Sequence, residues 1–262
     1  AAVGPWVVMA IAGIITEVPT NPLIRSCDLP ALGALARAHG AHLVVDASIA
    51  SPWNVDVLPH VDVALASLTK YGAAEGDILA GAAAVNPKGG DAAALRAGLT
   101  TGIAPMYRRD LARLAHEIRA VDRVLAGVNA STVRVAEYLA GRPEVKRLHW
   151  ALAPESRANF LQVARAPAAV GGMITFELEP GRFARFYDRV RLPKGPSFGL
   201  RNTLICPFIY LGHYELVTSA PGRELLARHS LNPELLRLSV GLEPVDEIIG
   251  ALAESLDALE TG

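Results

Sequence analysis

Two short apolar runs in the first third of the chain end in polar side chains that could do chemistry together. One run, LVV, leads to Asp46, and the other, VDVALA, leads to Ser67, Thr69 and Lys70. Buried strands of a parallel sheet have this composition, and their carboxyl ends line the ligand crevice of an open α/β sheet. We therefore expect a carboxylate, two hydroxyls and an amine to gather at one edge of a sheet. Buried charges there need a partner, and a bound cofactor would be one.

The same residues also have ordinary structural interpretations. An aspartate after a strand, such as Asp46, is often a helix N-cap or a turn residue. A lysine just beyond a strand end, such as Lys70, is usually solvated. Ser67 and Thr69 could be simple strand-end caps. The local pattern alone leaves both interpretations open.

The segments around these residues alternate between strand and helix. Residues 14–17 are typical of a buried strand, which the proline-containing turn at 19–22 ends. Asp28 is expected to cap a helix that Gly40 closes, and the strand to Asp46 follows. This order predicts a right-handed parallel crossover, and so an α/β fold with a mostly parallel sheet. Further expected elements are a strand over 78–85 and helices over 91–99 and 105–125, followed by a helix over 131–139 that could lead into a second domain.

From residue 143 the pattern changes to strands mixed with helices, which predicts a smaller α+β domain. We therefore expect a larger domain over residues 1–127 and a small C-terminal domain over residues 128–262. The expected strands of the second domain are 145–150, 172–178 and 236–240, and its expected helices are 182–190, 223–229 and 244–259.

Composition and charge exclude several classes of partner. The 262 residues are 51% hydrophobic and 19% charged, which suits globular domains with a real core. Twenty-five basic and 26 acidic residues leave a formal net charge of −1, so neither a nucleic acid nor an acidic membrane surface is an expected partner.

Cysteine and histidine spacing gives no indication of a metal site. The two cysteines form no CxxC pair and the seven histidines form no HExxH motif, so we expect no metal and a reducing cytoplasm. The apolar stretch 3–15 is too short to cross a bilayer and has no basic lead-in. We therefore expect neither a membrane helix nor a signal peptide there.

Five separated motifs stand out along the chain: E-x-P-x-N-P at 17–22, V-V-D at 44–46, S-x-T-K at 67–70, P-K-G-P-S-F-G at 193–199 and R-L-S-V-G at 237–241. Together they resemble the trans-sulfuration (Cys/Met metabolism) family of pyridoxal phosphate (PLP) enzymes. The subtype that the PKGPSFG run looks most like is cystathionine gamma-synthase. The resemblance implies the PLP-dependent transferase fold type I. It also implies that the N-terminal part of the large domain, with its phosphate loop and ring-stacking aromatic residue, is absent from this chain.

The resemblance assigns cofactor roles to the strand-end residues. Lys70 matches the lysine that forms a Schiff base with pyridoxal 5'-phosphate, and Asp46 matches the aspartate that keeps the pyridine nitrogen protonated. Ser67 and Thr69 match hydroxyls that bind the cofactor phosphate. Asn21 resembles a side chain near the ring oxygen of the cofactor and the substrate carboxylate, although an asparagine before proline is otherwise a turn former.

Substrate contacts are implied in the second half of the chain. Arg237 matches the arginine that grips the α-carboxylate of the substrate, and Ser197 matches a serine that helps to hold it. By strand alternation alone, an arginine between two leucines would face solvent. The chain departs from the family pattern at 73–77, where G-G-H-S-D is replaced by A-A-E-G-D. It also departs at Pro196, where several members have a glutamate or tyrosine that helps to choose the substrate.

These roles imply a cystathionine gamma-synthase-like γ-replacement on an O-acylhomoserine with cysteine, a step of methionine biosynthesis. A lyase acting on cystathionine or methionine is the nearest alternative, and a non-catalytic α/β fragment or decayed relative is the alternative from another class. Family members are homotetramers built as dimers of dimers, so the resemblance also implies a homo-oligomer.

Overall fold

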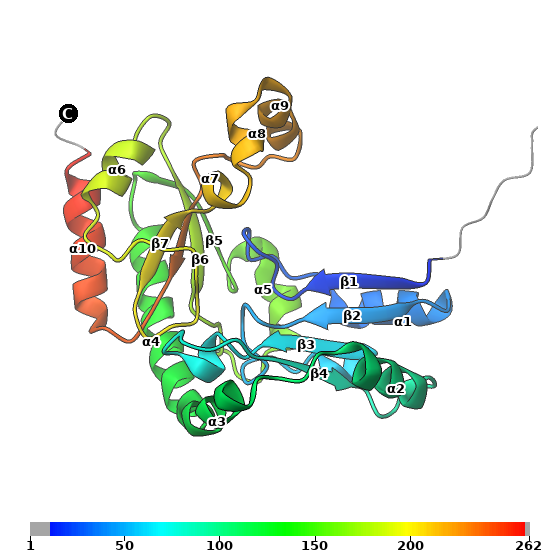
Figure 1. The fold of residues 1–262 in the computed structure, drawn as a ribbon. Coiled ribbons are helices and arrows are strands. Elements are labelled where there is room, and N and C mark those ends of the chain that lie inside the picture. Colours follow the sequence, from blue (N-terminus) through cyan, green and yellow to red (C-terminus); the bar gives the residue numbers. More distant parts are fainter. Residues whose placement is uncertain (1–10, 260–262) are drawn as a thin grey trace, which may run out of the picture.

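The computed structural model describes residues 11–259, which form two four-stranded sheets connected by a long helix (Figure 1). The strands are β1 (Gly13–Glu17), β2 (His42–Asp46), β3 (Val63–Ser67), β4 (Gly81–Val85), β5 (Val145–Trp150), β6 (Met173–Leu178), β7 (Leu204–Pro207) and β8 (Leu236–Ser239). The α-helices are α1 (Leu29–Ala38), α2 (Ala92–Gly102), α3 (Arg108–Glu117), α4 (Val121–Ala140), α5 (Pro154–Leu161), α6 (Phe183–Arg189), α7 (Phe208–Gly212), α8 (Tyr214–Thr218), α9 (Ala220–Arg228) and α10 (Val245–Asp257).

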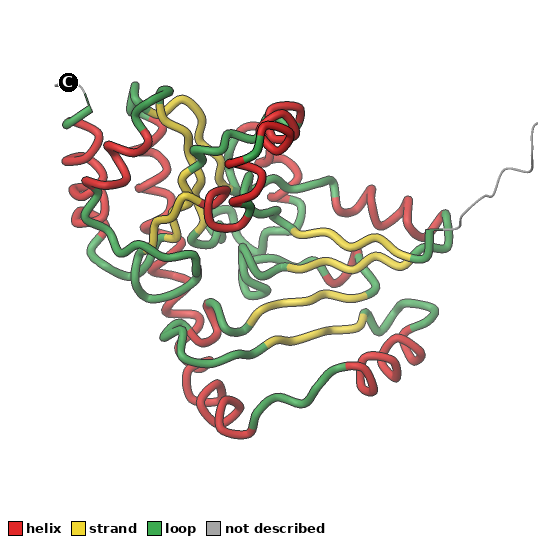
Figure 2. The backbone as a smooth tube through the Cα atoms, turned by 45° about the horizontal axis from the view of Figure 1, so that its top comes forward, coloured by secondary structure: helices red, strands yellow, loops and turns green. Residues whose placement is uncertain are grey.

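The first sheet is mostly parallel, as the sequence predicted. Its order is β1-β2-β3-β4, with β1, β2 and β3 parallel and β4 antiparallel to β3. The four strands lie side by side in Figure 2. Helix α1 makes the crossover between β1 and β2. The carboxylate of Asp28 accepts a hydrogen bond from the Ala31 amide (3.0 Å), so this residue caps α1 as predicted. The expected strand over 78–85 begins at Gly81 in the structure.

The prediction of separate helices over 105–125 and 131–139 is wrong. Helix α3 ends at Glu117, a 3₁₀ turn (Ile118–Ala120) follows, and α4 then runs unbroken from Val121 to Ala140. Packing explains the unbroken helix. Its first half buries Val124 and Val128 beside Tyr71 near the first sheet, and its second half buries Val135 and Leu139 under the second sheet. One helix serves both cores, so the polar residues near its middle do not end it.

The expected domain boundary between residues 127 and 128 lies inside α4. The two hydrophobic clusters that share this helix meet between Val128 and Val135. We keep the two-domain division as a proposal, with each domain defined by its own sheet and core and with α4 common to both.

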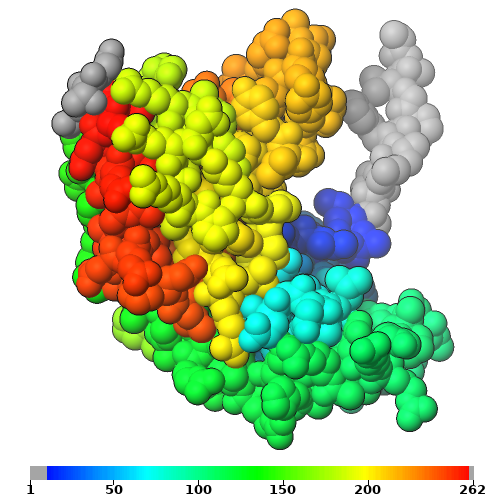
Figure 3. All heavy atoms as spheres, turned by 60° about the vertical axis from the view of Figure 1, so that its left-hand side comes forward, coloured from blue at the N-terminus to red at the C-terminus, as the bar shows by residue number. Residues whose placement is uncertain are grey.

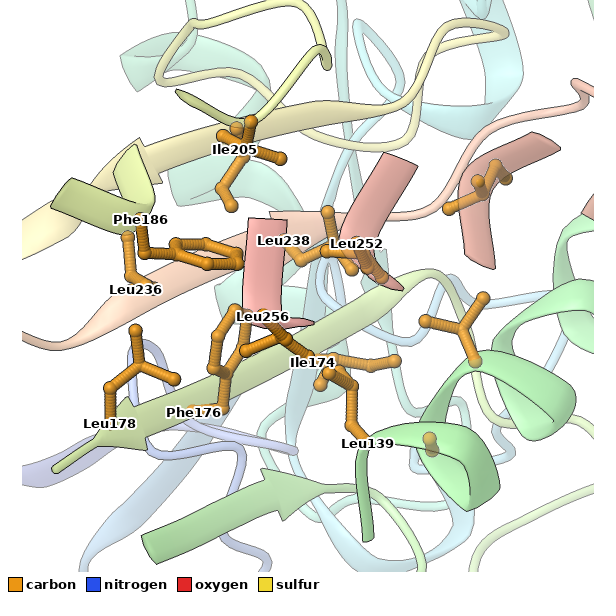
Figure 4. Packing of buried hydrophobic residues seen from close by; sticks show 14 of the residues in the cluster. Leu139, Ile174, Phe176, Leu178, Phe186, Ile205, Leu236, Leu238, Leu252 and Leu256 are labelled. Atoms are coloured by element: carbon orange, nitrogen blue, oxygen red, sulfur yellow. The ribbon is translucent and has the colours of Figure 1, made fainter. Parts of the chain in front are cut away.

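The second sheet is entirely antiparallel, in the order β5-β6-β8-β7. Its core packs against α4, α6 and α10, and the labelled side chains in Figure 4 interdigitate between the strands and these helices. Strands β5, β6 and β8 and helices α6, α9 and α10 lie close to their predicted ranges. Strand β7 and helices α5, α7 and α8 were not predicted, because each is short and lacks a long periodic pattern.

Helices α7, α8 and α9 form a lobe that stands out from the second sheet, drawn in orange in Figures 1 and 3. Its own small core contains Ile209, Val217, Leu226 and Leu235. Among residues 11–259 no helix is long and apolar enough to cross a membrane, and no group of three or more acidic, histidine or cysteine side chains is placed to hold a metal ion. The expectation about residues 3–15 lies partly outside the described residues.

Candidate active site

Tyr71 fixes the segment that follows β3, and so the backbone at Lys70. Its fully buried hydroxyl donates a hydrogen bond to the Ile49 carbonyl (3.0 Å) and accepts one from the Gly172 amide (2.8 Å). Gly172 directly precedes β6, so this hydroxyl connects the Lys70 segment to the second sheet. Burial raises the pKa of Tyr71, which keeps the phenol protonated and able to donate.

Tyr71→Phe is expected to lower the free energy of unfolding by about 1–3 kcal/mol, since it leaves a buried carbonyl and a buried amide without a partner. Chemical denaturation measures the change. Tyr107, a residue that is 68% exposed, provides the matched control. Tyr107→Phe should change the same free energy by less than about 0.5 kcal/mol. Equal stability of the two variants would contradict the connecting role of the Tyr71 hydroxyl.

Arg237 is a buried cation on β8, one of the two inner strands of the second sheet. It is 4% exposed, because Asn21, Pro196 and Phe208 contact its guanidinium. Its Nη1 donates a hydrogen bond to Asn21 Oδ1 (3.2 Å), and its Nη2 donates one to the Pro196 carbonyl. The Phe208 ring lies 4.4 Å from Cζ. Strand alternation alone had suggested a solvent-facing arginine, and the structure shows a buried one.

No carboxylate forms an ion pair with Arg237 in the part of the chain that the structure describes. Burial lowers the pKa of this guanidinium, and the neighbouring Cys206 thiol on β7 partly opposes the shift. Taking a guanidinium out of water without an anionic partner is costly. The arrangement therefore suits an anionic ligand that arrives from outside.

The Lys70 amine lies in the same region. Its Nζ donates a hydrogen bond to Ser197 Oγ (3.3 Å) and lies 4.7 Å from the centre of the Phe198 ring. Partial burial, and then the positive charge of Arg237, lower the pKa of Lys70. A lower pKa leaves more of the amine neutral and nucleophilic near neutral pH. The structure thus brings Lys70, Ser197, Arg237 and Asn21 together, although they are far apart in sequence.

The other predicted residues gather at the carboxyl ends of β2 and β3. Asp46, Ser67 and Thr69 line one cavity of about 1230 Å³. Ser48 connects the two strand ends, because its amide donates to Asp46 Oδ1 (2.7 Å) and its hydroxyl accepts from the Ser67 amide (2.6 Å). The Thr69 hydroxyl accepts from the Ala80 amide (2.9 Å).

Lys70 follows Thr69 directly but does not line this cavity. The predicted residues therefore form two neighbouring groups, which meet where β3 ends. One group holds Asp46, Ser67 and Thr69. The other holds the two cations Lys70 and Arg237 with Ser197 and Asn21.

Sequence reasoning missed the aromatic residues of the site. Phe198 contacts Lys70 and lies 5.9 Å from the Arg237 guanidinium, while Phe208 lies against the same guanidinium. Phe198 directly follows Ser197, so the motif itself held a signal. No sequence signal indicated Phe208, because only the pairing of β7 with β8 brings this residue to Arg237.

Comparisons with known proteins show the family of the chain. The sequence model described as "Cys/Met metabolism PLP-dependent enzyme" matches residues 10–257. A protein of Streptantibioticus cattleyicolor named L-2-amino-4-chloropent-4-enoate dechlorinase/desaturase is 40% identical over 94% of this chain and 49% of its own length. A cystathionine gamma-synthase of Neurospora crassa is 31% identical over 93% of this chain and 39% of its own length. The chain thus spans half or less of the length of these two relatives.

The fold agrees as well. A crystal structure of a cystathione gamma lyase from Micromonospora echinospora superposes with a TM-score of 0.80 at 30% identity, covering 94% of this chain and 64% of that chain. The family match covers nearly the whole described region, including every residue of the two groups above. The chain therefore belongs to the Cys/Met metabolism family of PLP-dependent enzymes, whose cofactor is pyridoxal 5'-phosphate.

Proposed function

We propose that Lys70 holds pyridoxal phosphate covalently and that the strand ends beside it hold the rest of the cofactor. The donor set fits the group: a carboxylate (Asp46) suits a pyridinium nitrogen, two hydroxyls (Ser67 and Thr69) suit a phosphate, and an amine of lowered pKa suits an aldehyde. When bound, the cofactor supplies an electron sink for chemistry at the α-carbon of an amino acid.

The observation that carries the proposal is the buried guanidinium of Arg237, which has no carboxylate partner among the described residues and lies beside a nucleophilic amine. A substrate α-carboxylate would supply the missing anion through a planar two-pronged contact. Two neutral side chains would orient this carboxylate. Ser197 is hydrogen-bonded to Lys70, and Asn21 is hydrogen-bonded to Arg237. The substrate class is therefore a small α-amino acid.

Lys70 Nζ is also the acid–base group of the proposal. With an amino acid bound at the cofactor, the Lys70 amine would be placed to take a proton from the α-carbon and then one from the β-carbon. Removal of the β-proton would let a group on the γ-carbon leave with the electron pair of its bond. With an O-acylhomoserine as substrate and the cysteine thiol as incoming group, the net reaction is the γ-replacement of a cystathionine gamma-synthase.

A second candidate is γ-elimination without replacement. It is favoured by the 40% identity to a protein named as a dechlorinase/desaturase of an amino acid that carries chlorine at C4, which is the γ-carbon. A cystathionine or methionine lyase belongs to the same class of reaction. Assembly as a dimer of dimers, a cytoplasmic location and a role in methionine biosynthesis are proposed on the family resemblance.

Product analysis separates the two candidates. The protein is supplied with PLP, an O-acylhomoserine and cysteine, and the products are identified by mass spectrometry. Cystathionine as the main product supports γ-replacement, whereas a keto acid and ammonia, formed whether or not cysteine is present, support γ-elimination. Absence of both products, together with no saturable PLP binding in a titration, would support the non-catalytic alternative instead.

A further inference from the structure

One aromatic ring touches both cations of the site. The centre of the Phe198 ring lies 4.7 Å from Lys70 Nζ and 5.9 Å from Arg237 Cζ. Both distances lie within the range in which a cation is attracted to the face of a ring. Lys70 comes from the end of β3 and Arg237 from β8, so the ring joins the charged groups of the two sheets.

The backbone holds this ring tightly against Lys70. Gly199 has a φ of +67°, and a Cβ there would lie 3.0 Å from Lys70 Cβ and 3.1 Å from the Tyr71 amide. The Gly199 amide also donates a hydrogen bond to Ser239 Oγ on β8 (3.1 Å). The Tyr71 ring meets the Phe198 ring edge to face at 6.4 Å. The ring is therefore packed from both sheets and has little freedom to turn away.

Two like charges in a partly buried site repel each other, and Arg237 accordingly lowers the pKa of Lys70. We propose that Phe198 is a positioning residue, which presents one ring to Lys70 and Arg237 and so keeps the amine and the guanidinium side by side. The ring offsets part of their repulsion and thereby sets how much of Lys70 is a neutral nucleophile. This inference rests on the proposed function only in taking Lys70 as the reacting amine.

The charged and titratable groups around Lys70 affect the pKa of its amine, so they must stay the same in any variant that is compared with the wild type. Arg237 on β8 is the charged group that acts on it, and the Cys206 thiol on β7 contacts that guanidinium in turn. The Tyr71 hydroxyl is directed away, toward Ile49 and Gly172. Changing the Phe198 ring leaves all of these groups in place.

Competitive amine labelling of the whole chain without cofactor tests the inference. The protein is labelled with trace acetic anhydride over a pH series, and peptide mass spectrometry gives the half-labelling pH of Lys70, with the exposed Lys88 as internal reference. Phe198→Leu keeps an apolar side chain but removes the ring, so the ammonium form loses its attraction. The half-labelling pH of Lys70 should fall by about half a unit, while that of Lys88 should not change. Phe198→Tyr, which keeps the ring, should behave as the wild type.

Phe208→Leu is the matched control, because the Phe208 ring contacts Arg237 and no contact with Lys70 is found for it among the described residues. It should leave the half-labelling pH of Lys70 unchanged. An unchanged or raised value for Phe198→Leu, or an equal fall for Phe208→Leu, overturns the inference. If Phe198→Leu does not fold, Phe198→Met carries the same comparison. Because no cofactor or substrate is used, a failure here differs from a failure of the product assay.

Discussion

Lys70→Ala is expected to abolish covalent attachment of pyridoxal phosphate to the protein. The Lys70 amine combines partial burial, a lowered pKa and a hydrogen bond to Ser197, and so we expect it to be the amine that reacts with an aldehyde. Wild-type protein treated with PLP and then with borohydride should carry the reduced cofactor on the Lys70 peptide, as peptide mass spectrometry would show. The variant should carry no site-specific label.

The catalytic activity of Lys70→Ala should also fall, because the variant cannot attach the cofactor covalently. Loss of the proton transfer alone would slow turnover by about 10²- to 10⁴-fold, and loss of the covalent link adds to this. Lys88→Ala is the control, because it removes an exposed amine in the turn that follows β4. This variant should keep both the label and the activity. A Lys70→Ala protein that still took up one equivalent of label at a defined lysine would show that another amine holds the cofactor.

The local part of this site could be predicted from the sequence. Asp46, Ser67 and Thr69 lie at strand ends because apolar runs of fixed length precede them, and the parallel pairing of β2 with β3 follows from the crossover through α1. These are short-range patterns, and they place the three side chains on one cavity. The roles of these residues toward the cofactor remain predictions.

The remaining part of the site depends on contacts that no local pattern contains. Arg237 is buried by Asn21, Pro196 and Phe208, which come from distant segments, and Phe208 directly follows β7, a strand that no local pattern predicted. The Tyr71 hydroxyl bonds to an amide 101 positions away in the chain. Helix α4 continues through a polar stretch because two cores need it. In each case tertiary packing determines the structure. Strand alternation or helix propensity alone would predict an exposed arginine and an interrupted helix.

Arg237→Met is expected to separate binding from stability. The guanidinium is buried, its pKa is lowered by that burial, and no carboxylate pairs with it among residues 11–259. Even a complete buried ion pair can often be replaced by apolar side chains of similar volume with a neutral effect or a gain of about 1–4 kcal/mol. Arg237 has no anionic partner among residues 11–259 to offset its desolvation, so its replacement by Met should be at least as well tolerated. Chemical denaturation of the cofactor-free variant should therefore give a free energy of unfolding equal to or above that of the wild type.

Substrate binding should change in the opposite direction. Loss of a buried contact to a charged group costs about 2–5 kcal/mol, so KM for the amino-acid substrate should rise by about 30-fold or more. Arg237→Lys keeps the charge but loses the planar fork, and its KM should lie between those of the Met variant and the wild type.

A different result would assign Arg237 another role. If Arg237→Met unfolded more easily by about 3 kcal/mol while KM stayed the same, the guanidinium would be a structural donor to Asn21 and Pro196. The expected pattern, a more stable protein that binds its substrate poorly, is what a site built for an external carboxylate should give. Such a site keeps a charge at the expense of folding stability, and it recovers that cost only when the substrate is bound.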